Sequence, residues 1–223
     1  MDAVIEKYLA KAELLGLRVE ITEFEGERIL NGVSGNISRY VVPDFIDAIG
    51  VRAFYGCQGL EAVRLPEQLK SIGNFAFTKC TGLREIRIPA SVTEIGTSAF
   101  SYCAGLTELE IPESVRVLPD AMCSDCGSLK KIKLPGHIAE IPAGAFARCG
   151  SLEAMTFPKA LKTIGHNAFE RCDSLKKLSF PKSLERIGAF AFYMCGNLSE
   201  VKYAGMPVTE RGAFDECPKL KKN

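Results

Sequence analysis

Nine cysteines are the residues of this chain most able to carry chemistry, because thiols can form disulfides, bind metals or remain inert. Cys123 and Cys126 have the Cys-x-x-Cys spacing of a redox pair or of half a zinc site. A structural zinc site needs four ligands. The chain holds no second pair of this kind, and its two histidines, His137 and His166, occupy different columns of the repeat described below. We therefore predict no metal site and no cofactor.

The other eight cysteines follow a regular spacing. Six successive gaps are 23 residues long and the last is 22. The cysteines are Cys57, Cys80, Cys103, Cys126, Cys149, Cys172, Cys195 and Cys217. A constant period of this length is typical of a stack in which one short supersecondary unit is repeated. A catalytic site needs unlike residues that converge once, and the chain also lacks Gly-x-Gly-x-x-Gly, phosphate-loop and His-Glu-x-x-His motifs, so we predict no catalytic residues and no enzyme activity.

The stack would place these eight thiols in one column that faces the core. Side chains that all point the same way have poor geometry for disulfides, and an odd total leaves one thiol over. We predict buried free thiols that act as small hydrophobic side chains and weak donors. Cys123 occupies a position where the other repeats have phenylalanine. The simplest interpretation is an underfilled rung in which Met122 compensates, with a redox or metal role as the alternative.

The remaining columns outline one repeat. Leu83–Ile88 alternates apolar and charged residues, as expected of a half-buried strand, and Pro89 ends it. Ser91–Ile95 is a second short extended piece, closed by Gly96. Ser98–Cys103 has the spacing of one tight helical turn, α or 3₁₀. Stacked rungs of this kind pair in parallel at about 4.8 Å.

This consensus, Leu-x-x-Ile-x-Ile-Pro-x-Ser-Val-Thr-x-Ile-Gly-x-x-Ala-Phe-x-x-Cys, resembles the bacterial surface-antigen (BspA-like) class of leucine-rich repeats over about residues 34–220. The resemblance implies an α/β fold: a curved, right-handed leucine-rich-repeat solenoid with a parallel strand ladder and short helical turns. It also implies a module that binds other macromolecules, often in adhesion at a cell surface or after secretion. It brings no catalytic motif.

We expect one structural domain with two parts. Residues 1–33 form an N-terminal cap, with a helix over 2–15 and a hairpin of 17–24 and 28–33, and residues 34–223 form a solenoid of about eight rungs. Asp2 and Glu6 make the first residues a poor secretion signal. An intracellular protein, a removed signal and a fragment of a longer surface protein therefore all remain open.

Composition narrows the class of partner. The net charge of +1 argues against nucleic-acid binding. The chain contains no run of about 18 apolar residues, so we predict no membrane-spanning helix. The charge is uneven: residues 1–110 hold 11 Lys/Arg against 15 Asp/Glu, whereas residues 111–223 hold 17 against 12. This is either drift on a solvated surface or a match to a partner with the opposite gradient. We expect a monomer that binds a protein partner.

The exposed side of the long strand in each repeat is the predicted binding face, because repeat proteins bind through such extended surfaces. Its charged residues are Arg64, Glu85, Arg87, Glu108, Glu110, Lys131, Lys133, Lys177 and Lys202. The face has no aromatic cluster, which counts against sugar stacking and leaves no obvious hot spot. The alternatives are a solubilising face on a structural spacer of a larger surface protein, and an intracellular scaffold.

Overall fold

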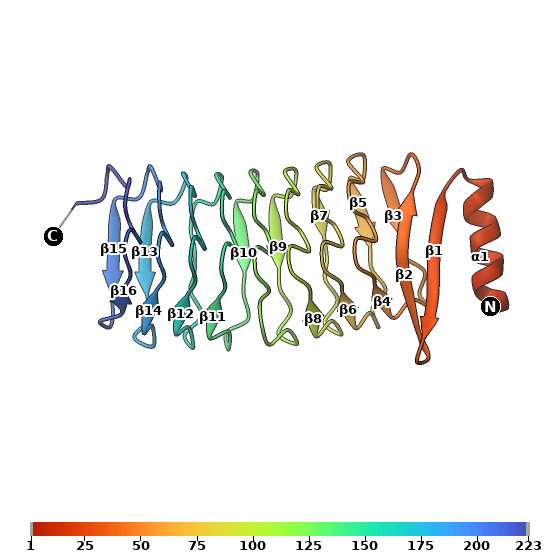
Figure 1. Cartoon of the computed structure of the whole chain (residues 1–223), viewed down its shortest axis with the longest axis horizontal. Helices are drawn as coiled ribbons and strands as arrows, with labels where there is room; N and C mark the ends of the chain where they lie inside the picture. Colours follow the sequence, from red (N-terminus) through yellow and green to blue (C-terminus); the bar gives the residue numbers. More distant parts are fainter. Residues whose placement is uncertain (1, 222–223) are drawn as a thin grey trace.

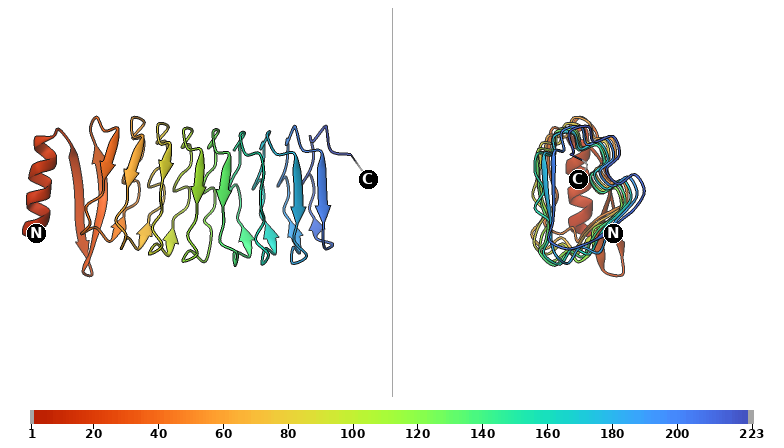
Figure 2. Two further views of the ribbon diagram at one scale, coloured as in Figure 1. Left: turned by 180° about the vertical axis from the view of Figure 1, so that it is seen from behind. Right: turned by 90° about the vertical axis from the view of Figure 1, so that its left-hand side faces the viewer.

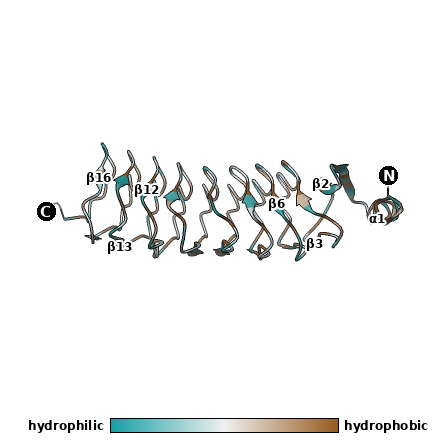
Figure 3. Ribbon diagram, turned by 90° about the horizontal axis from the view of Figure 1, so that it is seen from below, coloured by the Kyte–Doolittle hydropathy of each residue, from teal (hydrophilic) through white to brown (hydrophobic). Residues whose placement is uncertain are grey.

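The protein is a stack of about eight solenoid turns, or rungs, in a computed structural model that describes residues 2–221 (Figure 1). The rungs lie side by side along a nearly straight rod, with the N-terminal helix at one end and the C-terminus at the other (Figure 1). Seen along the rod, the rungs superpose into one flattened tube (Figure 2). Polar and apolar stretches recur rung after rung (Figure 3). The predicted solenoid is therefore confirmed, and its curvature is slight.

A helix and a hairpin precede the first rung. Helix α1 spans Ala3–Leu14 and begins where the Asp2 side chain accepts a hydrogen bond from the Val4 amide. Strands β1 (Arg18–Phe24) and β2 (Glu27–Ser34) form an antiparallel hairpin, and β2 then pairs in parallel with the first short strand of the stack. The hairpin thus provides the edge on which the solenoid stacks.

Most rungs contribute a strand to each of two parallel ladders. The long-strand ladder contains β3 (Arg39–Val41), β5 (Ala62–Arg64), β7 (Glu85–Ile86), β9 (Glu108–Glu110), β10 (Lys131–Lys133), β13 (Lys177–Phe180) and β15 (Glu200–Tyr203). The short-strand ladder contains β4 (Ala48–Ile49), β6 (Ser71–Ile72), β8 (Glu94–Ile95), β11 (Glu140–Ile141), β12 (Thr163–Ile164), β14 (Arg186–Ile187) and β16 (Val208–Thr209). Where strands pair, the register is kept from one rung to the next, so one column of the sequence becomes one row of side chains. The long-strand ladder is interrupted between β7 and β9 and between β10 and β13.

The short-strand ladder is interrupted between β8 and β11, and the glycine column explains why. The amides of Gly73 and Gly96 each donate to the preceding rung at 2.8 Å. A Cβ at Gly96 would lie 2.4 Å from the Asn74 amide nitrogen, so only glycine allows this approach. Pro119 and Pro142 occupy this column in the next two rungs, and proline has no N–H to donate. The bonds into and out of the rung that contains Val117 and Leu118 are therefore missing, and the ladder resumes at β11.

The third side of each rung is a turn arm, defined as the residues from the glycine column to the leucine after the cysteine, such as 73–83. We expected a short helical turn here, and the arm is instead a series of β-turns. Alternate amides bond within the rung and to the next rung: Cys80 N donates to Phe77 O at 3.1 Å, whereas Phe77 N donates to Ala99 O at 2.8 Å. Phe75 and Lys79 have φ values of 58° and 64°, which no helix allows. Every second amide of the arm donates a hydrogen bond to the next rung, so it is not free to form the hydrogen bonds of a helix.

The core contains two columns from the turn arm. Phenylalanine rings stack at centroid distances of 5.0 to 5.5 Å, except at the rung where Cys123 replaces the ring. Each periodic cysteine donates its Sγ hydrogen to a main-chain carbonyl of the preceding rung; for example, Cys103 Sγ lies 3.2 Å from Phe77 O. All nine cysteines are unpaired, and burial raises the pKa of the Cys80 thiol to about 12. The Cys80 thiol is therefore held neutral, and the eight periodic thiols are hydrogen-bonded.

Candidate interaction face

The long-strand ladder positions the predicted binding residues. Within each strand the apolar residue points inward and its two neighbours point to solvent; in β10, Ile132 is buried while Lys131 and Lys133 are exposed. Parallel, in-register pairing places Lys131 opposite Glu108 and Lys133 opposite Glu110. We call the exposed side of this ladder the strand face.

Ion pairs between neighbouring rungs cross the strand face. Lys131 Nζ lies 3.1 Å from Glu108 Oε1, and Lys133 Nζ lies 2.5 Å from Glu110 Oε1. The bond to Glu110 raises the pKa of Lys133. These side chains are mostly exposed, so solvent screens the pairs and they contribute little to stability. The pairs order the charges more than they stabilise the fold.

An open groove of about 1290 Å³ runs along this face over five rungs, from Ala62 to Thr156. Seven of the nine residues predicted for the face line it: Arg64, Glu85, Arg87, Glu108, Glu110, Lys131 and Lys133. Arg84, Lys130 and Glu153 add further charge to its lining. The charge along the groove changes sign from rung to rung. The rung with Arg84 and Arg87 is followed by a rung with two glutamates, and that rung is followed by the one that contains Lys130–Lys133.

Lys177 and Lys202 lie outside the groove, on β13 and β15. Ala154–Thr156 has no strand pairing and separates them from β10. Both lysines bind the same carboxylate, with each Nζ 2.9 Å from Glu200. The two ammonium groups lower the pKa of Glu200 to about 2. The structure thus divides the predicted residues into a groove and a separate C-terminal cluster.

Two acidic residues of the strand face were missed from the sequence. Asp44 and Glu67 follow the proline that ends the strand, and each reaches an arginine of the next rung: Asp44 lies 3.4 Å from Arg64, and Glu67 lies 2.8 Å from Arg87. In both pairs the acid precedes the arginine by 20 residues. This repeated spacing of 20 residues could have identified both ion pairs from the sequence, but it becomes visible only when the repeats are aligned with one another.

No group of three or more His, Cys, Asp or Glu residues within residues 2–221 is placed to hold a metal ion. The two histidines lie apart, His137 beside Glu113 at 3.3 Å and His166 beside Glu210 at 3.6 Å. Cys123 and Cys126 are both fully buried. In this part of the chain α1 is the only helix, and it lacks the length and apolar character needed to cross a membrane.

Comparison with known proteins fits this architecture. Residues 31–153 and 139–223 match the family described as the BspA type leucine rich repeat region, in six copies. The chain belongs to this family. Leucine-rich repeat proteins of this kind are protein-interaction or surface repeat modules and are generally non-enzymatic. No curated protein matches the chain.

Solved structures of other leucine-rich repeat proteins share the fold. A leucine-rich repeat protein from Bacteroides ovatus superposes with a TM-score of 0.68 at 22% identity, covering 92% of this chain and 79% of that one. The T. pallidum leucine-rich repeat protein gives 0.63 at 26% identity, with 91% and 88% covered. A leucine-rich cell surface protein from Faecalibacterium prausnitzii gives 0.64 at 23% identity, with 91% and 79% covered.

Proposed function

We propose that this BspA-type repeat protein is a non-enzymatic module that binds a protein partner through the strand face. The observation that carries the proposal is the open groove of about 1290 Å³, which spans five rungs and is lined by seven of the charged residues predicted from the repeat. An extended, rigid surface of this kind is how solenoid proteins usually recognise macromolecules.

The bands of charge indicate how a partner would be selected. Glu108 and Glu110 form an acidic band between the basic band of Arg87 and that of Lys131 and Lys133. A partner with the opposite order of charge would align with these bands, while a partner with the wrong order would place like charges together. Such complementarity governs specificity and the rate of association more than the total affinity.

A cell-surface setting, with adhesion as the use, extends this proposal. It is supported by the F. prausnitzii neighbour, which is described as a cell surface protein, and by the pneumococcal vaccine antigen PcpA, which shares the fold with a TM-score of 0.55 at 18% identity over 83% of this chain.

One observation favours the alternative of a structural spacer. The charges of the strand face already neutralise each other between rungs, as in the pair of Lys131 with Glu108. A face of paired charges stays soluble without a ligand. The experiment must therefore separate a binding face from a solubilising one.

A charge-swapped variant makes this separation. Glu108→Lys, Lys131→Glu, Glu110→Lys and Lys133→Glu together preserve the net charge and both ion pairs but invert the bands. Partners captured by the native protein from surface and soluble extracts would be purified, and their Kd measured against both proteins. We expect binding to weaken about tenfold or more, which corresponds to about 1.4 kcal/mol.

The matched control swaps the pair Lys162–Glu185, whose Nζ and Oε1 atoms lie 3.3 Å apart on the short-strand side. Circular dichroism would verify that both variants are folded. If the strand-face swap leaves every affinity unchanged, the binding face lies elsewhere. If the native protein captures no partner, the spacer becomes the better account.

A further inference from the structure

The turn arms of the first three cysteine-bearing rungs are consecutive, and together they carry basic but no acidic residues. Residues 50–60, 73–83 and 96–106 contain no aspartate or glutamate, although residues 1–110 as a whole carry a net negative charge. They contain two cations, Arg52 and Lys79, and both are exposed. Within residues 2–221, neither cation has a carboxylate within ion-pair distance.

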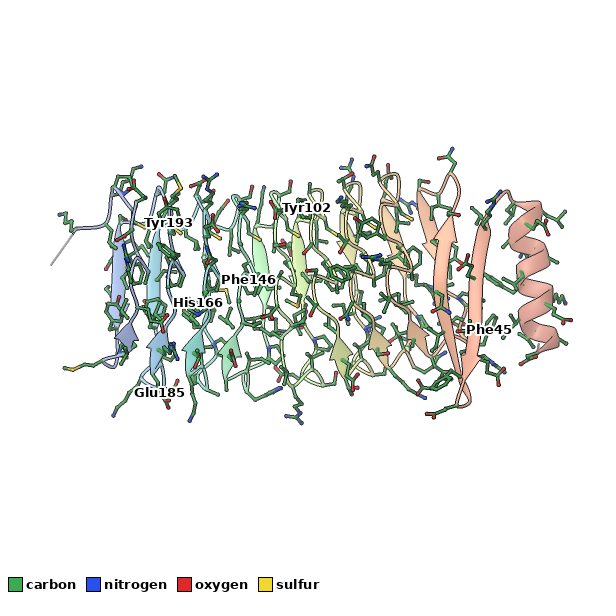
Figure 4. The ribbon with its side chains drawn as sticks, viewed as in Figure 1. Phe45, Tyr102, Phe146, His166, Glu185 and Tyr193 are labelled. Atoms are coloured by element: carbon green, nitrogen blue, oxygen red, sulfur yellow. The ribbon has the colours of Figure 1, made fainter. Side chains whose placement is uncertain are left out.

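Aromatic rings lie beside these two cations. The Arg52 guanidinium lies 5.7 Å from the centre of the Tyr55 ring and 5.5 Å from that of Phe75, and Lys79 Nζ lies 5.6 Å from the Tyr55 ring. Tyr55 and Tyr102 are each 44% exposed. Figure 4 shows Tyr102 near the upper edge of the stack. We call Arg52, Tyr55, Phe75, Lys79 and Tyr102 the basic aromatic patch.

The same column is neutralised further along the stack. Arg148 lies 3.6 Å from Asp125 and 3.8 Å from Glu170, and Arg171 also lies 3.8 Å from Glu170. These arginines occupy the position of Lys79 in their rungs, and their backbones have the same left-handed conformation. In the later rungs, turn-arm arginines thus have acidic side chains beside them. Among the residues that the structure describes, the cations of the basic aromatic patch do not.

The patch is also rigid. Arg52, Phe75, Lys79 and Tyr102 have φ values between 58° and 64°, and turn bonds and bonds between rungs fix these conformations. For example, Lys79 N donates to Ser101 O at 2.9 Å. A preorganised surface loses little conformational entropy when a partner binds.

We propose that the basic aromatic patch is a second interaction surface, distinct from the strand face, that docks an acidic segment of a partner protein. Carboxylates of the segment would pair with Arg52 and Lys79, and its apolar side chains would pack on Tyr55 and Tyr102. Tyrosine and arginine are enriched among the residues that dominate protein interfaces. Binding of a nucleic acid depends on Lys and Arg side chains that neutralise many phosphates, and two cations supply little of that charge.

The test uses the whole chain and a fluorescein-labelled peptide that alternates glutamate with phenylalanine, followed by fluorescence anisotropy. We expect saturable binding that a glutamine–phenylalanine peptide and a poly-glutamate peptide do not reproduce. Arg52→Gly with Lys79→Gly removes both cations and keeps the left-handed backbone, and Tyr55→Ala with Tyr102→Gly removes the rings. Each variant should weaken binding about tenfold or more.

Arg148→Gly with Arg171→Gly is the matched control, because it removes two cations from the column of Lys79 in the same left-handed backbone conformation. Equal weakening by this control, equal binding of poly-glutamate, or no binding of the glutamate–phenylalanine peptide would each overturn the proposal. The variant with a charge-swapped strand face should bind this peptide as the native protein does. Failure of the patch and failure of the strand face are therefore distinguishable.

Discussion

Met122 and Cys123 should form a compensating pair in the core, and a double-mutant cycle can measure it. The other repeats place alanine and phenylalanine at these two positions, and the phenylalanine rings stack on either side of this rung, at 5.5 Å for Phe77 and Phe100 and at 5.4 Å for Phe146 and Phe169. Cys123 breaks the stack, and both Met122 and Cys123 are fully buried. We infer that the methionine side chain fills much of the space that the missing ring leaves.

The magnitudes follow from the atoms gained and lost. Met122→Ala removes about three heavy atoms from a buried site and should lower the free energy of unfolding by about 2–5 kcal/mol. Cys123→Phe adds about five heavy atoms to a filled site and should lower it by about 1–3 kcal/mol. The double variant restores the alanine–phenylalanine pair of the other rungs, so it should lie within about 1 kcal/mol of the native protein. The coupling free energy is then about 2 kcal/mol or more.

Urea unfolding followed by circular dichroism would provide the four free energies, with constant m-values as the check that the unfolding mechanism is unchanged. The matched control is Ala99→Met with Phe100→Cys, which places the same methionine–cysteine pair in the neighbouring rung. This double variant should also lower the free energy of unfolding by less than the sum of its two single changes. If the Met122→Ala, Cys123→Phe double variant is destabilised by the full sum of the single effects, the two side chains do not share one space and the compensation is refuted.

Other features make simpler predictions. Gly96→Ala should lower the free energy of unfolding by about 1–3 kcal/mol in urea melts, because its Cβ would lie 2.4 Å from the Asn74 nitrogen. Ala121→Gly should raise it by up to about 1 kcal/mol in the same melts, because Ala121 has a φ of 50°. Iodoacetamide followed by mass spectrometry should modify the half-buried Cys57 before any other cysteine, and the remaining thiols should react only after unfolding. Because the folded-state pKa of Glu200 is about 2, below its usual 4.5, the stabilisation from this carboxylate should be complete above pH 4.5 and should disappear as the pH falls toward 2; an NMR titration with a midpoint near 4.5 would contradict this.

Much of the candidate site could be predicted because the period alone assigns side chains to columns. Once the strand of each repeat is placed, the exposed columns of Arg87, Glu110 and Lys133 follow without further information. The partners of these charges could not be predicted in the same way. Arg87 reaches Glu67 of the preceding rung at 2.8 Å, whereas Lys133 binds Glu110 in its own column, and that choice depends on side-chain reach across a finished ladder.

The conformation of the turn arm could not be predicted from the pattern of a single repeat. Ala, Phe and Cys at the spacing of Ala99, Phe100 and Cys103 favour a helical turn when one repeat is considered alone. In the stack, amides such as that of Phe100 donate to the next rung, here to Met122 O at 2.9 Å, so a continuous helix cannot form. The local sequence pattern favours a helical turn, but hydrogen bonds between residues about 22 positions apart prevent it from forming.

The repeat, its period and the residues that face the core can all be predicted from the sequence, because every stacked rung must bury the same apolar columns to be stable. Which charges neutralise each other depends on the folded stack. Arg148 has acidic neighbours at 3.6 and 3.8 Å, while Arg52 and Lys79 lie against aromatic rings with no carboxylate beside them in residues 2–221. Burial is set by the periodicity of the chain, whereas electrostatic pairing is set by distances between rungs that exist only after the chain has stacked.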